Sequence, residues 1–310
     1  MINKKIQSFT LIEILVVIVI VGILSSFIIV GMSSLSSKAD VAKVQVWANG
    51  LRNSGLTSIV SEYKFEGPNT GTAQALDLVD SWGSNNGNVT AAPPTIVASS
   101  SCSLGKCLSF NGTTQFVTIT DDTTLDFGTK MSAFIWVKGS SQDDKGVFGQ
   151  FDETNDLRSW AIATSGASAT KMKVHLASAG STVAKTYIST ETVFDNKWHY
   201  IGFTYNVNTL NLYIDGVNIT PASTSPDSVM TTLATSTALA SIGSYVNSTL
   251  VAKPFTGSLD NAILFNEAVT VSEVQRQYFS GLNNLLAKGQ ITNNEYNERI
   301  SLLNDSLGSK

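Results

Sequence analysis

The chain has 310 residues, which is enough for one large domain or two smaller ones. Only 14% of the residues are charged and the formal net charge at pH 7 is −4, so the sequence lacks the basic footprint of nucleic-acid binding. We therefore expect no nucleic-acid partner. Ser, Thr, Asn and Gly are frequent, which indicates that neutral polar groups provide most of the solubility.

The N-terminal segment from Phe9 to Val30 is predominantly apolar and carries a single charge, Glu13. A helix of about 20 apolar residues can span a bilayer. Lys4 and Lys5 precede the segment and favour a cytoplasmic N-terminus, with the bulk of the chain outside. A secretory signal peptide has a shorter apolar region followed by a cleavage site. We therefore predict a single-pass cytoplasmic membrane protein whose anchor is retained.

Glu13 requires an explanation, because a carboxylate within an apolar span costs about 2.5–3.5 kcal/mol on insertion scales. Such residues usually pair with another group. The alternative is that Glu13 lies near the membrane face and reaches the water, since it follows closely on the start of the apolar run. The sequence around it bears on the first interpretation.

The stretch Ser8-Phe9-Thr10-Leu11-Ile12-Glu13 follows a short leader with lysines, and Gly22 interrupts the apolar run. This segment resembles the N-terminus of type IV pilins and type II secretion pseudopilins. The resemblance implies cleavage between Ser8 and Phe9 by a prepilin peptidase, and N-methylation of Phe9. It also implies that Glu13 pairs with the N-terminal amine of a neighbouring pilin subunit, and that an inner-membrane assembly platform is a partner.

Two features depart from the usual pattern of that family. Ser8 stands where the family usually has Gly before the cleaved bond. Many major pilins have a proline near the outer end of the span, and Phe27 to Val30 contains none. The second departure favours a minor pilin or a pseudopilin.

Beyond the span, an amphipathic stripe predicts that the helix continues as a stem up to residue 55. Apolar residues recur there at intervals of three and four positions, at Val41, Val44, Trp47, Ala48 and Leu51. Residues 1–8 are then a leader, and residues 9–55 are a transmembrane helix with its stem.

From Leu56 onward the hydrophobic period changes to that of β-strands, beginning with the alternation over Ile59 to Phe65. Residues 81–94, rich in Gly, Asn and Pro, predict a long loop. Many short strands without helices between them predict an antiparallel sandwich or barrel. The further strand candidates are Cys107–Phe110, Phe116–Ile119, Ser132–Lys138, Gly146–Phe151, Trp160–Thr164, Lys171–Ala177, Thr186–Ser189, His199–Tyr205, Thr209–Ile214, Ala240–Ile242 and Gly257–Phe265.

Six motifs in this region occur in an order that carries a second resemblance. They are Tyr63-Lys64-Phe65, Gly105 to Gly112, Phe134 to Lys138, Trp198-His199-Tyr200, Leu212 to Gly216 and Phe255 to Asp260. Together they resemble the laminin-G-like, concanavalin A-like lectin/glucanase jelly roll, which we place at residues 56–280. The resemblance implies two curved antiparallel sheets, one of them concave and able to hold a glycan or a protein.

The end of the chain predicts helices. Ser272 to Phe279 predicts a short helix that closes the jelly roll. Residues 281–310 then predict a short helical hairpin joined at Gly289, with Thr292 as a cap and Glu295 three residues further on. This hairpin is similar to short C-terminal modules that mediate interactions. The alternative is a tail that packs on the jelly roll or frays.

The two cysteines, Cys102 and Cys107, are close in sequence. A zinc site needs about four ligands, and the histidines, His175 and His199, are distant in sequence. If the domain is exported, a disulfide is the preferred interpretation. Two free thiols are the alternative.

The sequence shows no catalytic pattern. Retaining glycosidases need two carboxylates about 5–5.5 Å apart, which alternate positions on one strand can supply. No predicted strand has that pattern, and Asp152, Glu153 and Asp156 lie in a predicted turn. The two histidines have no recognisable nucleophile motif nearby. We therefore predict that the protein is not an enzyme.

Calcium is the one cofactor that we consider, because oxygen-rich loops suit it and related jelly rolls often carry it. Asp260, with Glu66 or Asp80, would supply the ligands, although Asp260 can equally cap a turn. Trp160, Tyr187 and Tyr245 are either sugar-stacking residues or core residues. The ligand-binding residues are not identified by the sequence.

These observations predict a non-enzymatic minor pilin-like subunit of a type IV pilus-type filament. Its jelly-roll head is displayed at the cell surface for adhesion or for recognition of a glycan or surface protein. One alternative is a pseudopilin of a secretion or DNA-uptake machine. Others are a membrane-anchored carbohydrate-active enzyme and a structural subunit whose jelly roll binds no ligand.

Overall fold

The computed structural model describes residues 11–12, 15–20, 58–166, 168–179, 184–221, 230–247, 250–251 and 253–308. The chain divides into two compact units, residues 1–50 and 51–310. In the first unit the described residues are helical. Ser8, Phe9, Glu13 and the stem lie outside the described residues. Within the described ranges, no helix is long and apolar enough to cross a bilayer.

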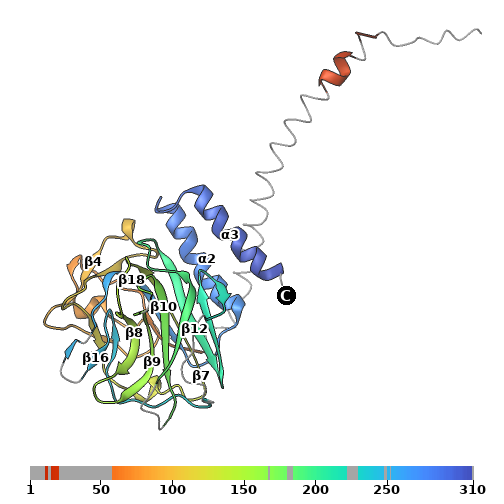
Figure 1. The fold of residues 1–310 in the computed structure, drawn as a ribbon. Coiled ribbons are helices and arrows are strands. Elements are labelled where there is room, and N and C mark those ends of the chain that lie inside the picture. The colour runs from red at the N-terminus through yellow and green to blue at the C-terminus, as the bar shows by residue number, and fades with distance from the viewer. Residues whose placement is uncertain are drawn as a thin grey trace, which may run out of the picture. The chain divides into compact units, whose positions relative to one another are not determined.

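The second unit is a sandwich of two large antiparallel sheets (Figure 1). The first is nine-stranded, with the order β14-β13-β12-β7-β18-β5-β4-β2 and β1 paired to β18 beside this path. Its strands are β1 (Ile59–Tyr63), β2 (Gly71–Thr72), β4 (Thr95–Val97), β5 (Cys107–Asn111), β7 (Lys130–Lys138), β12 (His199–Asn206), β13 (Thr209–Ile214), β14 (Val217–Ile219) and β18 (Thr256–Phe265).

The second sheet is seven-stranded, with the order β11-β10-β9-β8-β15-β6-β3. A separate two-stranded ribbon consists of β16 (Val246–Asn247) and β17 (Leu250–Val251). The strands of the seven-stranded sheet are β3 (Gly87–Asn88), β6 (Val117–Ile119), β8 (Gly146–Asp152), β9 (Leu157–Thr164), β10 (Lys171–Ala177), β11 (Ala184–Thr192) and β15 (Ala240–Ile242).

The predicted antiparallel sandwich is therefore confirmed, and each predicted strand is present with small shifts at its ends. The strands that the sequence did not predict, β2, β3, β4, β14, β16 and β17, have only two or three residues each. Such strands are too short to show a hydrophobic period. One of them, β3, lies within the stretch predicted as a loop.

Strand β7 shows that the middle of the nine-stranded sheet is buried on both of its faces. It pairs with β12 on one side and with β18 on the other. Ala133, Ile135 and Val137 pack into the core between the sheets. Phe134 and Trp136, which alternate with them, are equally buried on the opposite face. A strand buried on both faces reads as a continuous apolar run, as SAFIWVK does.

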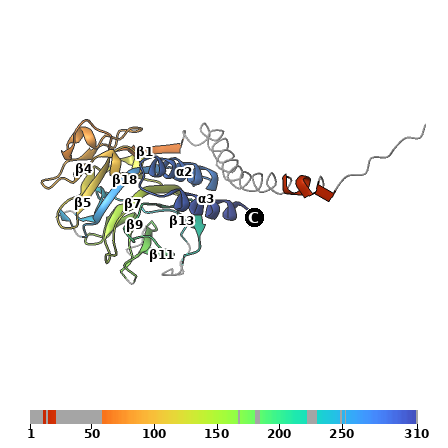
Figure 2. The same ribbon diagram turned by 90° about the horizontal axis from the view of Figure 1, so that it is seen from above.

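Two helices cover that opposite face, α2 (Val271–Ala287) and α3 (Asn293–Gly308), and they lie side by side (Figure 2). The ring of Tyr278 in α2 stacks on Trp136 at 5.6 Å between centroids. Gly289, with a φ of +67°, follows the end of α2, and Thr292 Oγ1 accepts a hydrogen bond from Glu295 N. The predicted helical hairpin is thus present, and it is packed on the sandwich.

The predicted break between the closing helix and the hairpin is wrong, because α2 runs through it without interruption. Gly281 lies at this point, and a Cβ atom there would stand 2.2 Å from the Trp136 ring. The glycine therefore serves close approach of helix to sheet rather than ending the helix. The boundary expected at residue 280 falls inside α2, and residues 51–310 form one compact unit.

Candidate functional site

The loop between Cys102 and Cys107 is closed by a disulfide, as the sequence predicted for an exported domain. Asp260 of β18 is fully buried and reaches this loop, where its Oδ2 accepts hydrogen bonds from Ser103 Oγ and Leu104 N at 2.8 and 2.7 Å. Burial raises the pKa of Asp260 to about 7. Asp260 therefore holds the disulfide loop against the sheet.

Lysines and a glutamate complete the contacts of this loop. Glu66 accepts a hydrogen bond from the Lys106 backbone N–H at 2.8 Å. The ammonium of Lys288, at the end of α2, donates to the carbonyl oxygens of Cys102 and Gly105 at 3.2 and 3.3 Å. Carbonyl oxygens that would suit a metal ion thus bind a side-chain cation instead.

Asp80, the third predicted calcium ligand, organises a different loop. Its Oδ1 accepts hydrogen bonds from the backbone N–H groups of Glu62, Trp82 and Gly83, at 2.9, 3.0 and 2.9 Å. Its Oδ2 accepts from Asn85 N at 3.1 Å. Four backbone donors thus surround one carboxylate, which fixes the path of residues 80–85.

The structure does not assemble the predicted calcium site. Glu66 and Asp260 instead accept hydrogen bonds from backbone N–H groups of the disulfide loop, and Asp80 accepts them from Glu62 and from residues 82–85. Among the described residues, no group of three or more His, Cys, Asp or Glu side chains is placed to hold a metal ion. Calcium binding stays a prediction.

The loop held by Asp80 forms one wall of a cleft of about 490 Å³. The start of β1 and Asn266 supply the rest of the described lining, together with Thr123, Thr124, Asp126 and Phe127. Trp82 lines this cleft with 46% of its surface exposed. The sequence analysis missed this site, although a lone tryptophan in a loop rich in Ser, Gly and Asn was the available signal.

A buried hydrogen-bond network joins the walls of the cleft. Asn85 Nδ2 donates to Ser61 Oγ at 2.9 Å and to Thr124 Oγ1 at 3.0 Å. The hydroxyl of Tyr63 donates to the Asn85 carbonyl oxygen at 2.6 Å. Asp122 caps the 3₁₀ turn Thr123–Leu125 by accepting from Thr124 N. The cleft is therefore formed by fixed loops.

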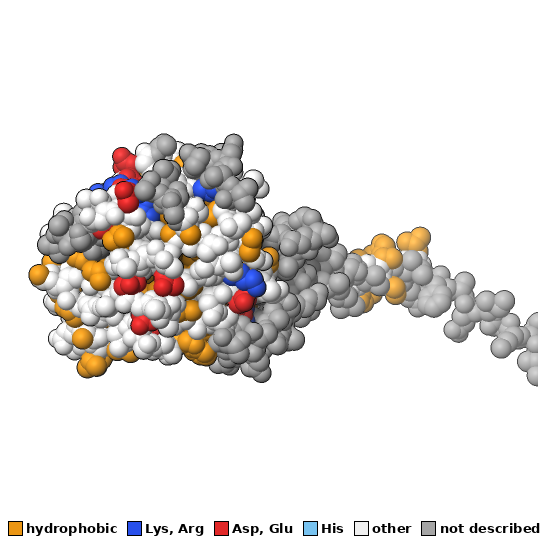
Figure 3. All heavy atoms as spheres, turned by 90° about the horizontal axis from the view of Figure 1, so that it is seen from below, with side chains coloured by type: hydrophobic (Ala, Val, Ile, Leu, Met, Phe, Trp, Pro, Cys, Tyr) orange, Lys and Arg blue, Asp and Glu red, His pale blue; other side chains and the backbone are white. Residues whose placement is uncertain are grey.

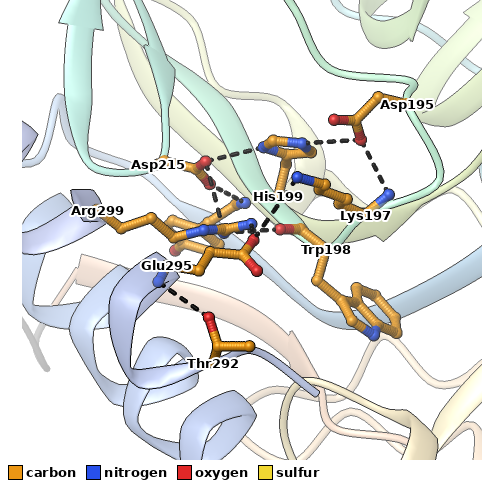
Figure 4. Close-up of polar contacts among 9 residues, drawn as sticks. Asp195, Lys197, Trp198, His199, Asp215, Thr292, Glu295 and Arg299 are labelled. Atoms are coloured by element: carbon orange, nitrogen blue, oxygen red, sulfur yellow. Dashed lines mark hydrogen bonds and ion pairs between the residues drawn. The ribbon is translucent and has the colours of Figure 1, made fainter. Parts of the chain in front are cut away.

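A second polar cluster joins α3 to the nine-stranded sheet (Figure 4). His199 of β12 contacts two carboxylates, Asp215 Oδ2 at 2.8 Å from Nδ1 and Asp195 Oδ1 at 3.2 Å from Nε2. Burial alone would lower the pKa of His199, but the two carboxylates outweigh it and raise it to about 9. Arg299 of α3 donates to the Trp198 carbonyl oxygen at 2.9 Å and to Glu295 at 2.9 Å.

This cluster explains how the C-terminal hairpin is attached. The cationic His199 lies between two acids, and Arg299 brings a further cation from the helix to Asp215, 3.7 Å away. Each buried charge thus has an opposite charge beside it, which is the condition for keeping it in the interior. The cluster docks α3 and offers no nucleophile.

His175 of β10 is in the opposite electrostatic situation. Burial lowers the pKa of His175 to about 3, so the ring is neutral. It stacks on Phe151 at 5.0 Å, and its Nδ1 contacts Thr186 Oγ1 at 2.9 Å. Trp160 and Tyr245 are buried as well, so neither offers an exposed platform for a sugar.

The carboxylates beside the strands do not form an alternating pair. Asp152 accepts hydrogen bonds from Thr154 N at 2.9 Å and from Asn155 Nδ2 at 2.7 Å, as a turn residue does. Asp156 binds Arg158, and Glu153 binds Lys253. These acids act in turns and ion pairs, as the sequence indicated.

Comparison with known proteins agrees with this architecture. Residues 111–275 match the concanavalin A-like lectin/glucanases superfamily, and residues 3–29 match the prokaryotic N-terminal methylation motif. Among curated proteins, no sequence matches this chain.

Three solved structures illustrate the likeness. The binding domain of Paraclostridial Mosquitocidal Protein 1 has 15% identity and a TM-score of 0.55, covering 74% of this chain and 53% of that domain. The botulinum neurotoxin serotype D binding domain has 14% identity and a TM-score of 0.53, with coverages of 74% and 53%. Domain 4 of AbnA, a GH43 extracellular arabinanase from Geobacillus stearothermophilus in complex with arabinotriose, has 18% identity, a TM-score of 0.48 and coverages of 70% and 97%.

The likeness to the two toxin binding domains shows the fold alone, and this chain spans about half of their length. The family match covers more than half of the chain, from β5 to α2. A methylation motif precedes it at the N-terminus. The chain therefore belongs to the concanavalin A-like lectin/glucanases superfamily, in a pilin-like form with an N-terminal methylation motif.

Proposed function

We propose that this chain is a non-enzymatic minor pilin-like subunit of a type IV pilus-type filament, whose jelly-roll head recognises a glycan or a protein at the cell surface. The observation that carries the proposal is the order of two matches in one chain. A methylation motif at residues 3–29 is followed by a concanavalin A-like domain. The first is a signal for processing and assembly, and the second is a scaffold for binding.

In this proposal the subunit waits in the cytoplasmic membrane with its head outside. Prepilin peptidase cleaves the bond between Ser8 and Phe9, and Phe9 is methylated. The inner-membrane assembly platform then transfers the subunit into the filament. There the Glu13 carboxylate pairs with the N-terminal amine of a neighbouring subunit, which compensates both charges in an apolar surrounding.

The head in this proposal binds without turnover. Its acids at the ends of strands are engaged in turns and ion pairs, and its two histidines are packed in strands. Its surface suits an exported recognition domain, because neutral polar side chains and backbone cover most of the face in Figure 3, with few charged groups.

The test uses the full chain in cells that assemble filaments. Filaments sheared from the surface should contain the chain, and its mature form should begin at a methylated Phe9 by mass spectrometry. Glu13→Ala should leave the chain in the membrane fraction but keep it out of sheared filaments, and Glu13→Gln should behave alike because it also lacks the charge. Thr10→Ala is the matched control. Normal incorporation of Glu13→Ala would refute the pairing role.

A further inference from the structure

We propose that the cleft beside Trp82 is the ligand site of the head and that it takes a neutral saccharide. The inference rests on the proposed function, because a recognition head requires a ligand site. At about 490 Å³ the cleft falls within the range of small-molecule sites, which is about 300–1,000 Å³.

Trp82 provides the first part of the argument. Its side chain is 46% exposed, whereas Trp136, Trp160 and Trp198 are at most 3% exposed. An indole in a cleft offers a broad apolar face and one N–H donor. The C–H face of a sugar ring can pack on such a face while its hydroxyls bond elsewhere.

The other lining residues provide the hydroxyls and amides. Ser84, Thr123 and Asn266 line the cleft, and their side-chain groups can both donate and accept hydrogen bonds. Such groups suit sugar hydroxyls, which also donate and accept hydrogen bonds. Asp126 adds one carboxylate, which accepts hydrogen bonds from hydroxyl groups.

The charge of the lining selects against anionic ligands. None of the described residues that line the cleft is Lys, Arg or His. A phosphate, a sulfate or the carboxylate of an acidic sugar would lose water there without meeting a cation, and Asp126 would repel it. A neutral sugar meets neither obstacle.

The cleft is also fixed before a ligand arrives. Asp80 holds the backbone N–H groups of residues 82, 83 and 85, and Asn85 ties the loop to Thr124. A site that is already ordered loses less conformational entropy on binding. Weak individual contacts to hydroxyl groups can then add up to measurable affinity.

The experiment measures binding of sugars to the full chain in micelles of a detergent without a sugar head group, since such head groups would compete. The probes are neutral pentoses, hexoses and N-acetylhexosamines, beside glucuronic acid, sialic acid and sulfated hexoses. Titration calorimetry and quenching of the exposed Trp82 fluorescence are the readouts. At least one neutral sugar should bind and protect Trp82 from acrylamide, while the acidic sugars should not.

Three variants make the assignment specific. Trp82→Ala should weaken binding at least about tenfold, and Trp82→Tyr should retain most of it because the aromatic face remains. Leu76→Ala is the matched control, since Leu76 is 65% exposed and lies outside the cleft lining. Circular dichroism and the melting temperature check that each variant is folded.

Four results would overturn the proposal. One is that no neutral sugar binds at about 10 mM, a concentration that would mostly fill a site of millimolar affinity. Another is that Trp82→Ala binds the sugar with unchanged affinity. The others are that only the acidic sugars bind, and that a free amine binds and competes with the sugar. Filament entry is scored separately and should be normal in Trp82→Ala. A failure of the sugar site is therefore distinguishable from a failure of the pilin-like function.

Discussion

One histidine should be cationic and the other neutral throughout the physiological pH range. The chain contains only two, and the pKa of an unperturbed histidine is about 6.5. His199 lies between Asp195 and Asp215, and its pKa is raised to about 9. His175 is buried beside Phe151, and its pKa is lowered to about 3. Neither ring should titrate between about pH 5 and 8.

The raised pKa of His199 also predicts how stability depends on pH. Protonated His199 is favoured in the folded chain, so its contribution is fully present below pH 6.5 and is lost as the pH rises through about 9. One pKa unit corresponds to about 1.4 kcal/mol, so the loss amounts to about 3 kcal/mol. The contribution of neutral His175 to stability has the opposite pH dependence. It is fully present above pH 6.5 and is lost as the pH falls toward about 3.

The measurement is nitrogen NMR of the chain labelled only at histidine, together with urea unfolding between pH 6.5 and 9.5. One imidazole should show the cationic form and the other the neutral form at every pH near neutrality. The free energy of unfolding should fall by about 3 kcal/mol more in the wild type than in His199→Gln over that range. Asp215→Asn should lower the pKa of His199, because Asp215 is the main group that raises it. A ring that titrates near pH 6.5 would refute the reasoning.

Two further predictions follow from packing and from the disulfide. Gly281→Ala should destabilise the chain by about 1–3 kcal/mol, because the new methyl group would meet the Trp136 ring, whereas Ser280→Ala on the exposed side of α2 should be nearly neutral by urea unfolding. Thiol titration of the denatured exported chain should find no free thiol before reduction and two after it, and two reactive thiols without reductant would contradict the Cys102–Cys107 bond.

Much of the architecture could be predicted from local pattern. Strands such as Lys171–Ala177 and Thr209–Ile214 have the bounds predicted from the sequence, because the residue pattern of a strand is local. The cap at Thr292 and the glycine at 289 placed the hairpin for the same reason. The N-terminal motif and the spacing of the cysteines were also readable directly.

The roles of the polar residues were decided by tertiary structure, because their partners are distant in sequence. Asp260 meets Ser103 across 157 positions, and Arg299 meets the Trp198 carbonyl across 101. In the sequence, a carboxylate within a strand pattern looks the same whether it binds a metal ion, caps a loop or pairs with a histidine. The reason for a glycine at position 281 inside α2 is likewise the Trp136 ring beside it, which is distant in sequence.

The sequence by itself determined the class of protein: a pilin-like N-terminus, an antiparallel jelly roll and a helical hairpin. These features depend on which residue types occur at short spacing, and that pattern is visible in the sequence before the chain folds. Only the tertiary structure decided that the hairpin packs on the sandwich and that Asp80 builds a loop instead of a metal site. Only the fold brings Trp82, Thr124 and Asn266 to one cleft, because strand pairing, and not sequence distance, sets which loops become neighbours.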